Sequence, residues 1–525
     1  MKKRTGGEKK RLKMNNILID LVYPFYGNLP LAGAVLLSVF FGLSYRKGLK
    51  ILVIIIAIIA VLASLFLNIF YFSETENFSS YLFKFGFLQT IESLIVLFSA
   101  LNILIFLSIK RFDDRNLIKV IIIFIFSLIC INIFIVSKNF LMIFSSLSLF
   151  LICFFQLLSL LNKSSSDDGH LKYSIKNYII RFVLVAVFSL LLILVGFSLI
   201  FGATDFKDFT QILQSENIDN TMMTAGIILV FLSIYFYLFI FPFQNAYLKL
   251  GKRCEPTSLL FIWFLYFPSG IFLFLKVYDI FIHFLDKNSQ VVSIILIAIS
   301  ILCILGGNIG AVSSKSLRRI FLFLFLAVIG MSVLCLAYQG LDLMDRQRVV
   351  WLIVANLLTC ILFYFPAFAI FFDIEKQTGS DYILKSKGFT RKNKFLGINL
   401  IILMFSFAGI IGTTGFLTRF FYLKPHLGFF SGNNVNMAEV NSVLVLLAAI
   451  ISVIGVLFIL ANIVRVIVVL LKTPDCDNEV KRFPRLYYPY ILIYTMLVLF
   501  IGIIGSLQIF NIDISFFAYD IINVF

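Results

Sequence analysis

The segment MMTAGIILVFLSIYFYLFIFPF (Met222–Phe243) contains no charged residue and has a proline, Pro242, next to its end. An apolar run of about 20 residues is long enough to cross the hydrocarbon core of a membrane as an α-helix. Proline removes a backbone donor and clashes with the preceding turn, so this helix is expected to break near Pro242. The segment therefore predicts a helical membrane protein with irregular backbone at one point within the bilayer.

Comparable apolar stretches occur from Val22 to Phe510 of the 525 residues and give fourteen predicted crossings. They are residues 22–43, 49–72, 85–109, 117–136, 139–161, 177–202, 222–244, 256–282, 291–312, 317–339, 349–373, 395–423, 440–471 and 487–509. Hydrophobic residues make up 61% of the sequence, well above their share in soluble domains. The predicted fold class is an all-α polytopic membrane protein embedded in the lipid bilayer.

Charge and cysteine usage exclude several other classes of protein. The formal net charge of +17 would favour nucleic-acid binding in a soluble protein, but here the basic residues lie at the ends of apolar stretches, where membrane topology accounts for them. The seven cysteines have no C-x-x-C spacing, and the three histidines are scattered. We therefore predict no nucleic-acid partner, no metal or haem site and no disulfide framework.

Lysine and arginine are concentrated in every second gap between the predicted crossings. The gap after the first crossing holds Arg46, Lys47 and Lys50, whereas the basic residue in the gap after the eighth is Lys287 alone. Basic loops are retained in the cytoplasm. We therefore predict that both chain termini lie on the external, periplasmic side of the cell inner membrane.

Residues 1–13 contradict this orientation, because they carry seven basic residues at an end that is predicted to be external. A translation start at Met14 removes the conflict. The alternative is the basic n-region of a signal peptide, although no small-residue cleavage site follows it. We accordingly treat 1–13 as a leader that need not be translated and 14–525 as a single membrane domain.

Crossing twelve contains a second interruption, Ala408-Gly-Ile-Ile-Gly-Thr-Thr-Gly415, whose three glycines weaken a helix. Five crossings separate it from Pro242, so crossings four to eight and nine to thirteen can be superimposed with opposite orientation. Broken helices at matching places of inverted repeats mark ion pathways near the bilayer midplane, although either break alone could be a packing kink. We predict inverted five-helix repeats at 117–282 and 291–471, with a C-terminal helix and tail at 487–525.

Three segments resemble one family of membrane proteins. The run Gly307-Asn-Ile-Gly-Ala-Val-Ser-Ser-Lys-Ser-Leu-Arg-Arg319 is similar to the GN-x-x-A-L-x-Q-x-x-x-KR signature of the proton-translocating subunits of respiratory complex I and their antiporter relatives. FPFQNAYLKLGKRCEPTS (Phe241–Ser258) resembles the family's P-F-H-x-W-x-P-D run, and FSFAGIIGTTGFLTRFFYL (Phe405–Leu423) its S-L-A-G-I-P-x-x-x-G-F-x-x-K segment. Within the family, the fourteen crossings and short tail are most similar to subunit N of bacterial NADH-quinone oxidoreductase; the alternative is a D-type subunit of a cation/proton antiporter.

The resemblance implies a chain without redox centres that works beside other membrane subunits of a respiratory complex. FMN, iron–sulfur clusters and quinone would belong elsewhere in that complex, and this chain would move protons when quinone is reduced. In the family, a carboxylate on crossing five and lysines on crossings seven, eight and twelve relay these protons, since both members of such a pair must ionise near neutral pH.

This sequence departs from that set of charges. Alignment on the motifs places Ser148 at the carboxylate position, Tyr237 at the crossing-seven lysine and Phe267 at the crossing-eight lysine. Arg419, on crossing twelve, keeps a charge, but an arginine is effectively always protonated. Ile411 also replaces the proline of the crossing-twelve break, which weakens the expectation of a break there. We therefore expect a degenerate proton path with Arg419 as its candidate residual charge.

The other charged residues near the crossings are interpreted as structural. Glu92 is the best remaining carboxylate, and we expect it at a membrane edge or a subunit contact. Arg465 is expected to extend its long stem to the cytoplasmic surface. We interpret Asp373 and Glu375 as a solvated helix end and Arg318 as an interface anchor.

Three functions remain open at this point. The favoured one is a membrane subunit of a proton-translocating NADH:quinone oxidoreductase. The second is a subunit of a multi-subunit monovalent cation/proton antiporter. The third is a non-transporting structural or assembly subunit, which the missing glutamate and lysines favour directly.

The orientation can be tested with topology reporters. A reporter fused after Phe525 or after Lys287 should report an external location, and one inserted within residues 164–168 should report the cytoplasm, because the basic gaps stay inside. Reporter activity on both sides of the membrane provides the measurement. A cytoplasmic chain end would contradict either the fourteen crossings or their direction.

Overall fold

The computed structural model describes residues 27–43, 49–74, 87–109, 114–163, 169–204, 220–284, 289–340, 346–430, 439–473 and 487–509. Within these ranges the chain is built of helices and short turns, with one isolated bridge between Ser316 and Tyr382. The leader at 1–13 and both chain ends fall outside the described residues, so the start site and the orientation stay predictions.

Eleven helices in the described part of the chain are long and apolar enough to cross a membrane. Three shorter apolar helices, Leu29–Phe41, Thr221–Tyr237 and Lys394–Ala408, fall within the three remaining predicted crossings. The all-α polytopic membrane fold is therefore confirmed. The count of fourteen crossings and the inverted repeats stay predictions.

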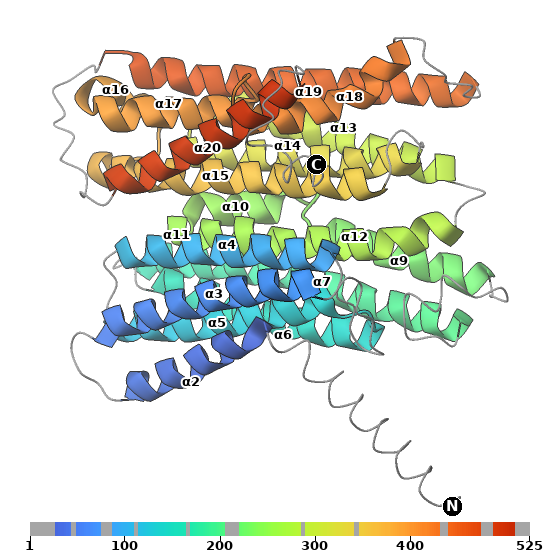
Figure 1. Ribbon diagram of the computed structural model, residues 1–525, viewed down its shortest axis with the longest axis horizontal. Coiled ribbons are helices and arrows are strands. Elements are labelled where there is room, and N and C mark those ends of the chain that lie inside the picture. Colours follow the sequence, from blue (N-terminus) through green and yellow to red (C-terminus); the bar gives the residue numbers. More distant parts are fainter. Residues whose placement is uncertain are drawn as a thin grey trace, which may run out of the picture. The chain divides into compact units, whose positions relative to one another are not determined.

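The chain forms two compact units, the first comprising Met1–Leu238 and Thr257–Phe284. Figure 1 shows the helices of this unit, coloured from blue to green, running side by side. They are α2 (Leu29–Leu43), α3 (Leu49–Glu74), α4 (Phe87–Ile109), α5 (Asp114–Val136), α6 (Phe140–Lys163), α7 (Gly169–Thr204), α9 (Asn220–Tyr237), α11 (Pro256–Phe261), the π-helical turn η2 (Ile262–Tyr266) and α12 (Phe267–Phe284).

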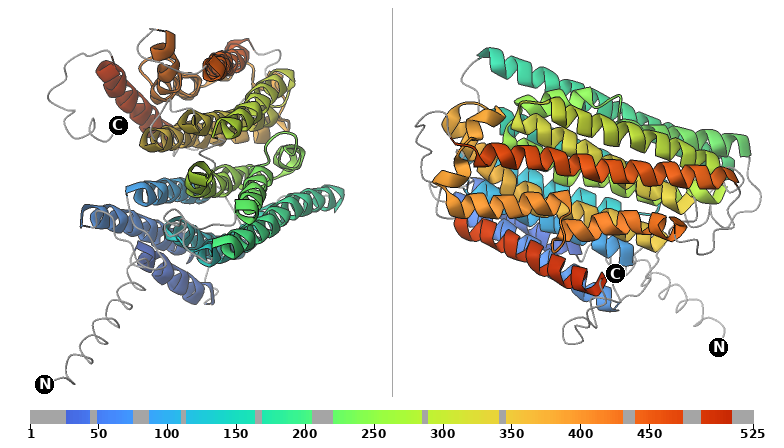
Figure 2. Two further views of the ribbon diagram at one scale, coloured as in Figure 1. Left: turned by 90° about the vertical axis from the view of Figure 1, so that its right-hand side faces the viewer. Right: turned by 90° about the horizontal axis from the view of Figure 1, so that it is seen from above.

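The second unit comprises Phe239–Pro256 and Leu285–Phe525. Its helices are α10 (Asn245–Arg253), α13 (Ser289–Ser313), α14 (Leu317–Gly340), α15 (Arg346–Thr378), the 3₁₀ turn η4 (Ile383–Ser386), α16 (Phe389–Lys392), α17 (Lys394–Ala408), α18 (Thr414–Phe430), α19 (Glu439–Leu471) and α20 (Tyr487–Ile509). Within this unit α13 packs against α14 and α19, and α15 packs against α17, α18 and α20 (Figure 2).

The break predicted at Pro242 is present. Helix α9 ends at Tyr237, Phe239 has a positive φ of 48°, the Phe241–Pro242 peptide is cis, and α10 begins only at Asn245. The break coincides with the point at which the chain leaves the first unit for the second. Proline thus ends one helix and separates two segments that pack in different units.

The break predicted in crossing twelve is also present, although Ile411 stands in place of proline. Gly409 closes α17 in the left-handed conformation at φ +93°, and its N–H donates to the carbonyls of Phe405 and Ser406. Gly412 adopts φ +85°, and α18 starts at Thr414. Glycine has no Cβ to oppose a positive φ, so two glycines supply the break that proline would otherwise cause.

The two half-helices of this break touch at Gly415. A Cβ on Gly415 would lie 1.6 Å from the carbonyl oxygen of Ser406, an atom that cannot move without moving α17. Nearby, the Ser406 and Thr414 hydroxyls are 3.0 Å apart and join the two halves directly. The local geometry of the break therefore depends on a missing side chain.

Gly415→Ala should destabilise the protein, although glycine-to-alanine changes within helices normally stabilise by about 1 kcal/mol. The added methyl overlaps backbone, and overpacking of this kind costs about 1–3 kcal/mol. Gly202→Ala on α7 is the matched control, because no atom lies within 4 Å of a Cβ at that position. Thermal unfolding of the detergent-solubilised protein should show a lower Tm for the first variant alone. An unchanged Tm for both would contradict the close approach at Gly415.

Candidate functional site

A first buried polar cluster, made of Tyr237, Tyr266 and Ser269, lies where α9 ends. The Tyr237 hydroxyl donates to Ser269 Oγ at 2.7 Å, because the Ser269 hydroxyl itself donates to the Tyr266 carbonyl at 2.7 Å. The Tyr266 hydroxyl donates to the Tyr237 carbonyl at 2.9 Å. The two tyrosine rings stack with centroids 4.5 Å apart and planes 4° from parallel. All three side chains are fully buried.

The broken helix explains this arrangement. The last carbonyls of a helix have no intrahelical donor, and within a membrane each of them needs a partner from the protein or from water. Tyr266 supplies that donor to Tyr237 from the end of the π-helical turn η2. Gly270 allows the close approach, since a Cβ there would lie 2.6 Å from the Tyr237 ring. The cluster therefore satisfies the carbonyl at the end of α9, and each hydroxyl of the cluster has a hydrogen-bond partner.

The sequence-based site residues of the first unit are only partly brought together. Tyr237 is in the cluster, whereas Phe267 is buried beside Tyr266 and contributes no polar atom. Ser148 is half-buried, and its hydroxyl donates to the Ser145 carbonyl of its own helix at 2.9 Å. Tyr266 was not identified from the sequence. The ungapped alignment selects Phe267, whereas the polar group belongs to the residue before it. Two polar residues three apart in an otherwise apolar crossing were the available signal.

A second buried polar cluster, made of Arg419, Asn356, Met331, Ser332 and Tyr422, lies beside the α17–α18 break. Arg419 is 2% exposed. One guanidinium nitrogen lies 3.3 Å from Asn356 Oδ1 and 3.0 Å from Met331 Sδ. The Asn356 amide nitrogen in turn lies 3.3 Å from Ser332 Oγ and 3.4 Å from the Tyr422 hydroxyl.

Arg419 is a buried cation surrounded by neutral groups. Its second terminal nitrogen lies 3.5 Å from the Phe407 carbonyl, and its Nε has no hydrogen-bond partner in the described part of the chain. The Phe407 carbonyl belongs to the last turn of α17, where the helix dipole is negative and favours a cation. Gly409 leaves room for the Arg419 stem, because a Cβ there would lie 2.5 Å from Arg419 Cγ. The break thus creates both the space and the field that hold this charge.

A second cation within a crossing was missed by sequence analysis. Lys276, on α12, donates to the carbonyls of Phe134 and Ser137 at 2.7 Å each, and its Nζ lies 5.1 Å from the centre of the Phe134 ring. Those carbonyls are at the C-terminal end of α5, where a basic side chain satisfies orphan acceptors. Lys276 therefore has a structural role. Its position, as an isolated lysine in an apolar crossing, was the sequence signal that could have identified it.

Two further charged side chains can be compared with their sequence-based interpretations. Glu92 is fully buried within the first unit, where α4 packs against α3, α5 and η2, so the expected contact with another subunit is wrong, and the membrane-edge position stays a prediction. Arg465 is half-buried, and its guanidinium donates to the carbonyls of Ala311, Val312 and Ser314, at the end of α13. The expectation that it reaches the cytoplasmic surface stays a prediction. The contacts of Arg465 come from a helix end that is more than 150 residues away in sequence.

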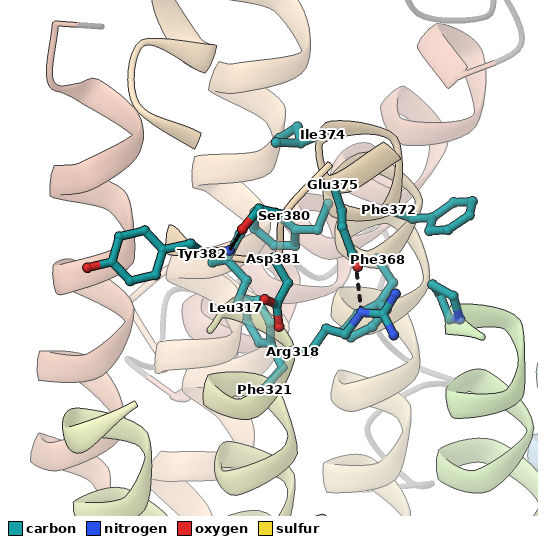
Figure 3. Close-up of a pocket in the computed structure, with 12 residues that line it drawn as sticks. Leu317, Arg318, Phe321, Phe368, Phe372, Ile374, Glu375, Ser380, Asp381 and Tyr382 are labelled. Carbon is teal, nitrogen blue, oxygen red and sulfur yellow. Dashed lines mark hydrogen bonds and ion pairs between the residues drawn. The ribbon is translucent and has the colours of Figure 1, made fainter. Parts of the chain in front are cut away.

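Glu375, interpreted as part of a solvated helix end, and Arg318, interpreted as an interface anchor, are both partly buried and pair with each other. Arg318 Nε lies 2.8 Å from Glu375 Oε2, and a second Arg318 nitrogen donates to the Cys254 carbonyl at 2.6 Å. Figure 3 shows these two side chains pointing toward each other at a small cavity, whose lining also includes phenylalanines and the polar residues Ser380 and Asp381. The ion pair ties the end of α15 to the start of α14, and the second Arg318 bond ties the start of α14 to the residue after α10.

The sequence of this chain is similar to those of known membrane proteins. The sequence model of the family described as NADH:quinone oxidoreductase/Mrp antiporter, transmembrane, matches residues 137–444, more than half of the chain. NADH-quinone oxidoreductase subunit N 2 of Thermodesulfovibrio yellowstonii is 24% identical over 394 residues, which are 74% of this chain and 81% of that protein. Subunit N of Hydrogenovibrio crunogenus is 23% identical over 234 residues, 43% of this chain and 47% of that protein.

Solved structures share the fold at low sequence identity. A chain of respiratory complex I from Thermus thermophilus has a TM-score of 0.67 at 16% identity, covering 92% of this chain and 98% of its own. A chain of the Mrp complex from a Dietzia species has a TM-score of 0.73 at 14% identity, covering 93% and 95%. A chain of an archaeal membrane-bound sulfane sulfur reductase has a TM-score of 0.72 at 15% identity, covering 91% and 94%.

Two tyrosine variants test the first polar cluster. Tyr266→Phe should destabilise the protein by about 1–3 kcal/mol, because it leaves the Tyr237 carbonyl buried without a donor. Tyr237→Phe should cost much less, since Ser269 keeps its bond to the Tyr266 carbonyl. The shift in Tm of the solubilised protein gives the ranking. Equal or reversed shifts would show that the Tyr266 hydroxyl does not stabilise the end of α9.

Proposed function

This chain belongs to the NADH:quinone oxidoreductase/Mrp antiporter transmembrane family, and we propose that it is the N-type membrane subunit of a proton-translocating NADH:quinone oxidoreductase in a bacterial inner membrane. Its similarity over most of its length to a named N subunit supports this assignment. Its partners are then the other membrane subunits of the complex. FMN, iron–sulfur clusters and quinone belong to other parts of that complex, and this chain contributes to moving protons when quinone is reduced.

The observation that carries the proposal is the buried Arg419 at the α17–α18 break. A charged side chain at membrane depth costs about 3 kcal/mol or more on insertion scales, so such residues commonly mark ion pathways. Arg419 has no ion-pair partner among the described residues, and its Nε is left without an acceptor. Water reaching the break would satisfy that donor. The second unit therefore retains a charged site of the kind that shapes proton movement.

Arg419 is not expected to release a proton near neutral pH, because the guanidinium group of arginine stays protonated in proteins. Its role is electrostatic: a fixed positive charge disfavours a proton on the water or side chain next to it. Movement of the guanidinium between Asn356 and the Phe407 carbonyl would shift that field along the break. Both oxygen contacts are long, at 3.3 and 3.5 Å, and the shorter contact, 3.0 Å to Met331 Sδ, is to a weak acceptor.

The first unit supports a different role. Tyr237, Tyr266 and Ser269 are neutral and hydrogen-bonded to one another, so this cluster stores no charge. We propose that the first unit no longer relays protons by the family's route and that the path of the chain as a whole is degenerate. This neutral cluster also favours the rival function, a structural or assembly subunit, which the following experiment separates from ours.

Arg419→Met should lower the number of protons translocated per quinone reduced while the complex still assembles. The charge has no acidic partner among the described residues, so its removal relieves a burial cost and leaves no carboxylate unpaired. Proton uptake and quinone reduction should be measured on the same inverted vesicles, and assembly by native gel. Arg181→Met is the matched control, since Arg181 lies exposed on α7, and it should leave the ratio unchanged.

Two outcomes would count against the proposal. Normal pumping in Arg419→Met would favour the structural rival. Loss of assembly in that variant would make Arg419 a packing residue instead.

A further inference from the structure

Helix α20 begins with three tyrosines that face the interior of the second unit. Tyr487, Tyr490 and Tyr494 are 4%, 8% and 4% exposed, and their spacing places them on one helical face. Tyrosines near the start of a membrane helix ordinarily lie at the lipid interface, with their rings among the head groups. These three side chains are buried within the protein, so a role in an interfacial aromatic belt does not explain their position.

Helices α15 and α17 supply further polar groups to the same face. The Tyr487 hydroxyl lies near the carboxylate of Asp373, in the last turns of α15. One residue beyond Tyr494, the Thr495 hydroxyl donates to Asn399 Oδ1 of α17 at 2.8 Å. The partly buried Asp373 thus stands at the outer end of a polar strip that continues inward along α20.

The inner two tyrosines of this strip are not satisfied by protein atoms. Their ring centroids lie 4.9 Å apart and their hydroxyls are close to each other. Neither the Tyr490 nor the Tyr494 oxygen, however, has a partner with hydrogen-bond geometry among the described residues. A buried hydroxyl without a partner costs about 1–3 kcal/mol. Ordered water normally fills such a position, and one bridging molecule would satisfy both oxygens.

We propose that Asp373, Tyr487, Tyr490 and Tyr494 line a hydrated proton inlet that leads from the membrane surface along α20 toward the α17–α18 break. The eight residues from Tyr487 to Tyr494 span about 10 Å, roughly a third of the hydrocarbon core. The basic gaps of the sequence assign this end of α15 and α20 to the cytoplasm. The inlet rests on the proposed function, because it supplies the proton-moving break beside Arg419.

Helix α20 also connects the strip to the break. Gly502 packs directly on it, since a Cβ there would lie 2.2 Å from Thr413 Cα and 2.6 Å from the Gly412 carbonyl oxygen. The same helix therefore contacts the surface carboxylate at one end and the break at the other.

The chemistry of transfer conserves charge at each step. Asp373 takes a proton from bulk water and becomes a neutral carboxylic acid. It passes a proton to the Tyr487 oxygen while the proton of that hydroxyl leaves toward the next water. Tyr490 and Tyr494 act in the same way, so no phenolate forms and one proton advances.

A double variant, Tyr490→Phe with Tyr494→Phe, tests the transfer. It removes both hydroxyls and keeps both rings, so packing is preserved. We expect the same decrease in protons per quinone as in Arg419→Met, with normal assembly. The Tyr488 ring lies on another face of α20 and packs against Phe395 of α17. Tyr488→Phe is therefore the matched control and should leave the number of protons per quinone unchanged.

The outcomes separate the inlet from the function on which it rests. A decrease in Arg419→Met together with normal pumping in the double variant would overturn the inlet and leave the proposed function standing. Normal pumping in both would overturn both.

Hydration of the strip can be measured without pumping. Tyr494→Cys and Met496→Cys place thiols at similar depth on α20, but Met496 is 60% exposed on the outer face of the helix. A thiol reacts as its thiolate, which forms in water and not in hydrocarbon. A membrane-impermeant maleimide added from the Asp373 side should label Tyr494→Cys at least roughly tenfold faster, after subtraction of the native cysteines. Equal rates would overturn the inlet.

Discussion

The structure depends on one constraint, that a backbone carbonyl freed within a membrane needs a donor. Each helix end in the bilayer and each break creates such carbonyls, and distant polar side chains satisfy them. Tyr266 donates to the end of α9, Lys276 to the end of α5, and Arg465 to the end of α13. These three polar side chains in the described crossings therefore stabilise the fold, although a search for ion pathways would select them first.

Arg419 differs from the other intramembrane cations in how well it is bound. Lys276 makes two contacts of 2.7 Å to carbonyls, and Arg465 makes three contacts to the end of α13. Arg419 instead has oxygen contacts of 3.3 and 3.5 Å, a 3.0 Å contact to the weak acceptor Met331 Sδ, and an Nε without a partner among the described residues. A cation that stabilises a scaffold is expected to be saturated with acceptors. A loosely held one is free to respond to a moving charge, which is why the functional proposal rests on it.

The sequence predicted what depends on local chemistry and missed what depends on neighbours. Apolar runs gave the helices, and Pro242 with the crossing-twelve glycines gave both breaks, because each acts on its own backbone. Ile411 weakened the second expectation needlessly, since left-handed glycines break a helix without proline. The partners of Arg465 and Glu375 come from helices at least 57 residues away in sequence, so no local pattern could identify them. Tyr266 was missed by one position, within the limits of an ungapped alignment.

The two breaks do not carry equal weight as signs of transport. At Pro242 the chain passes from the first unit to the second, so a break there is needed for the chain path whether or not protons move. The α17–α18 break lies wholly inside the second unit, where a continuous helix would satisfy every backbone group more simply. Its cost is two left-handed glycines and a buried cation. Because the fold itself does not require that cost, the break beside Arg419 is the stronger indication of function.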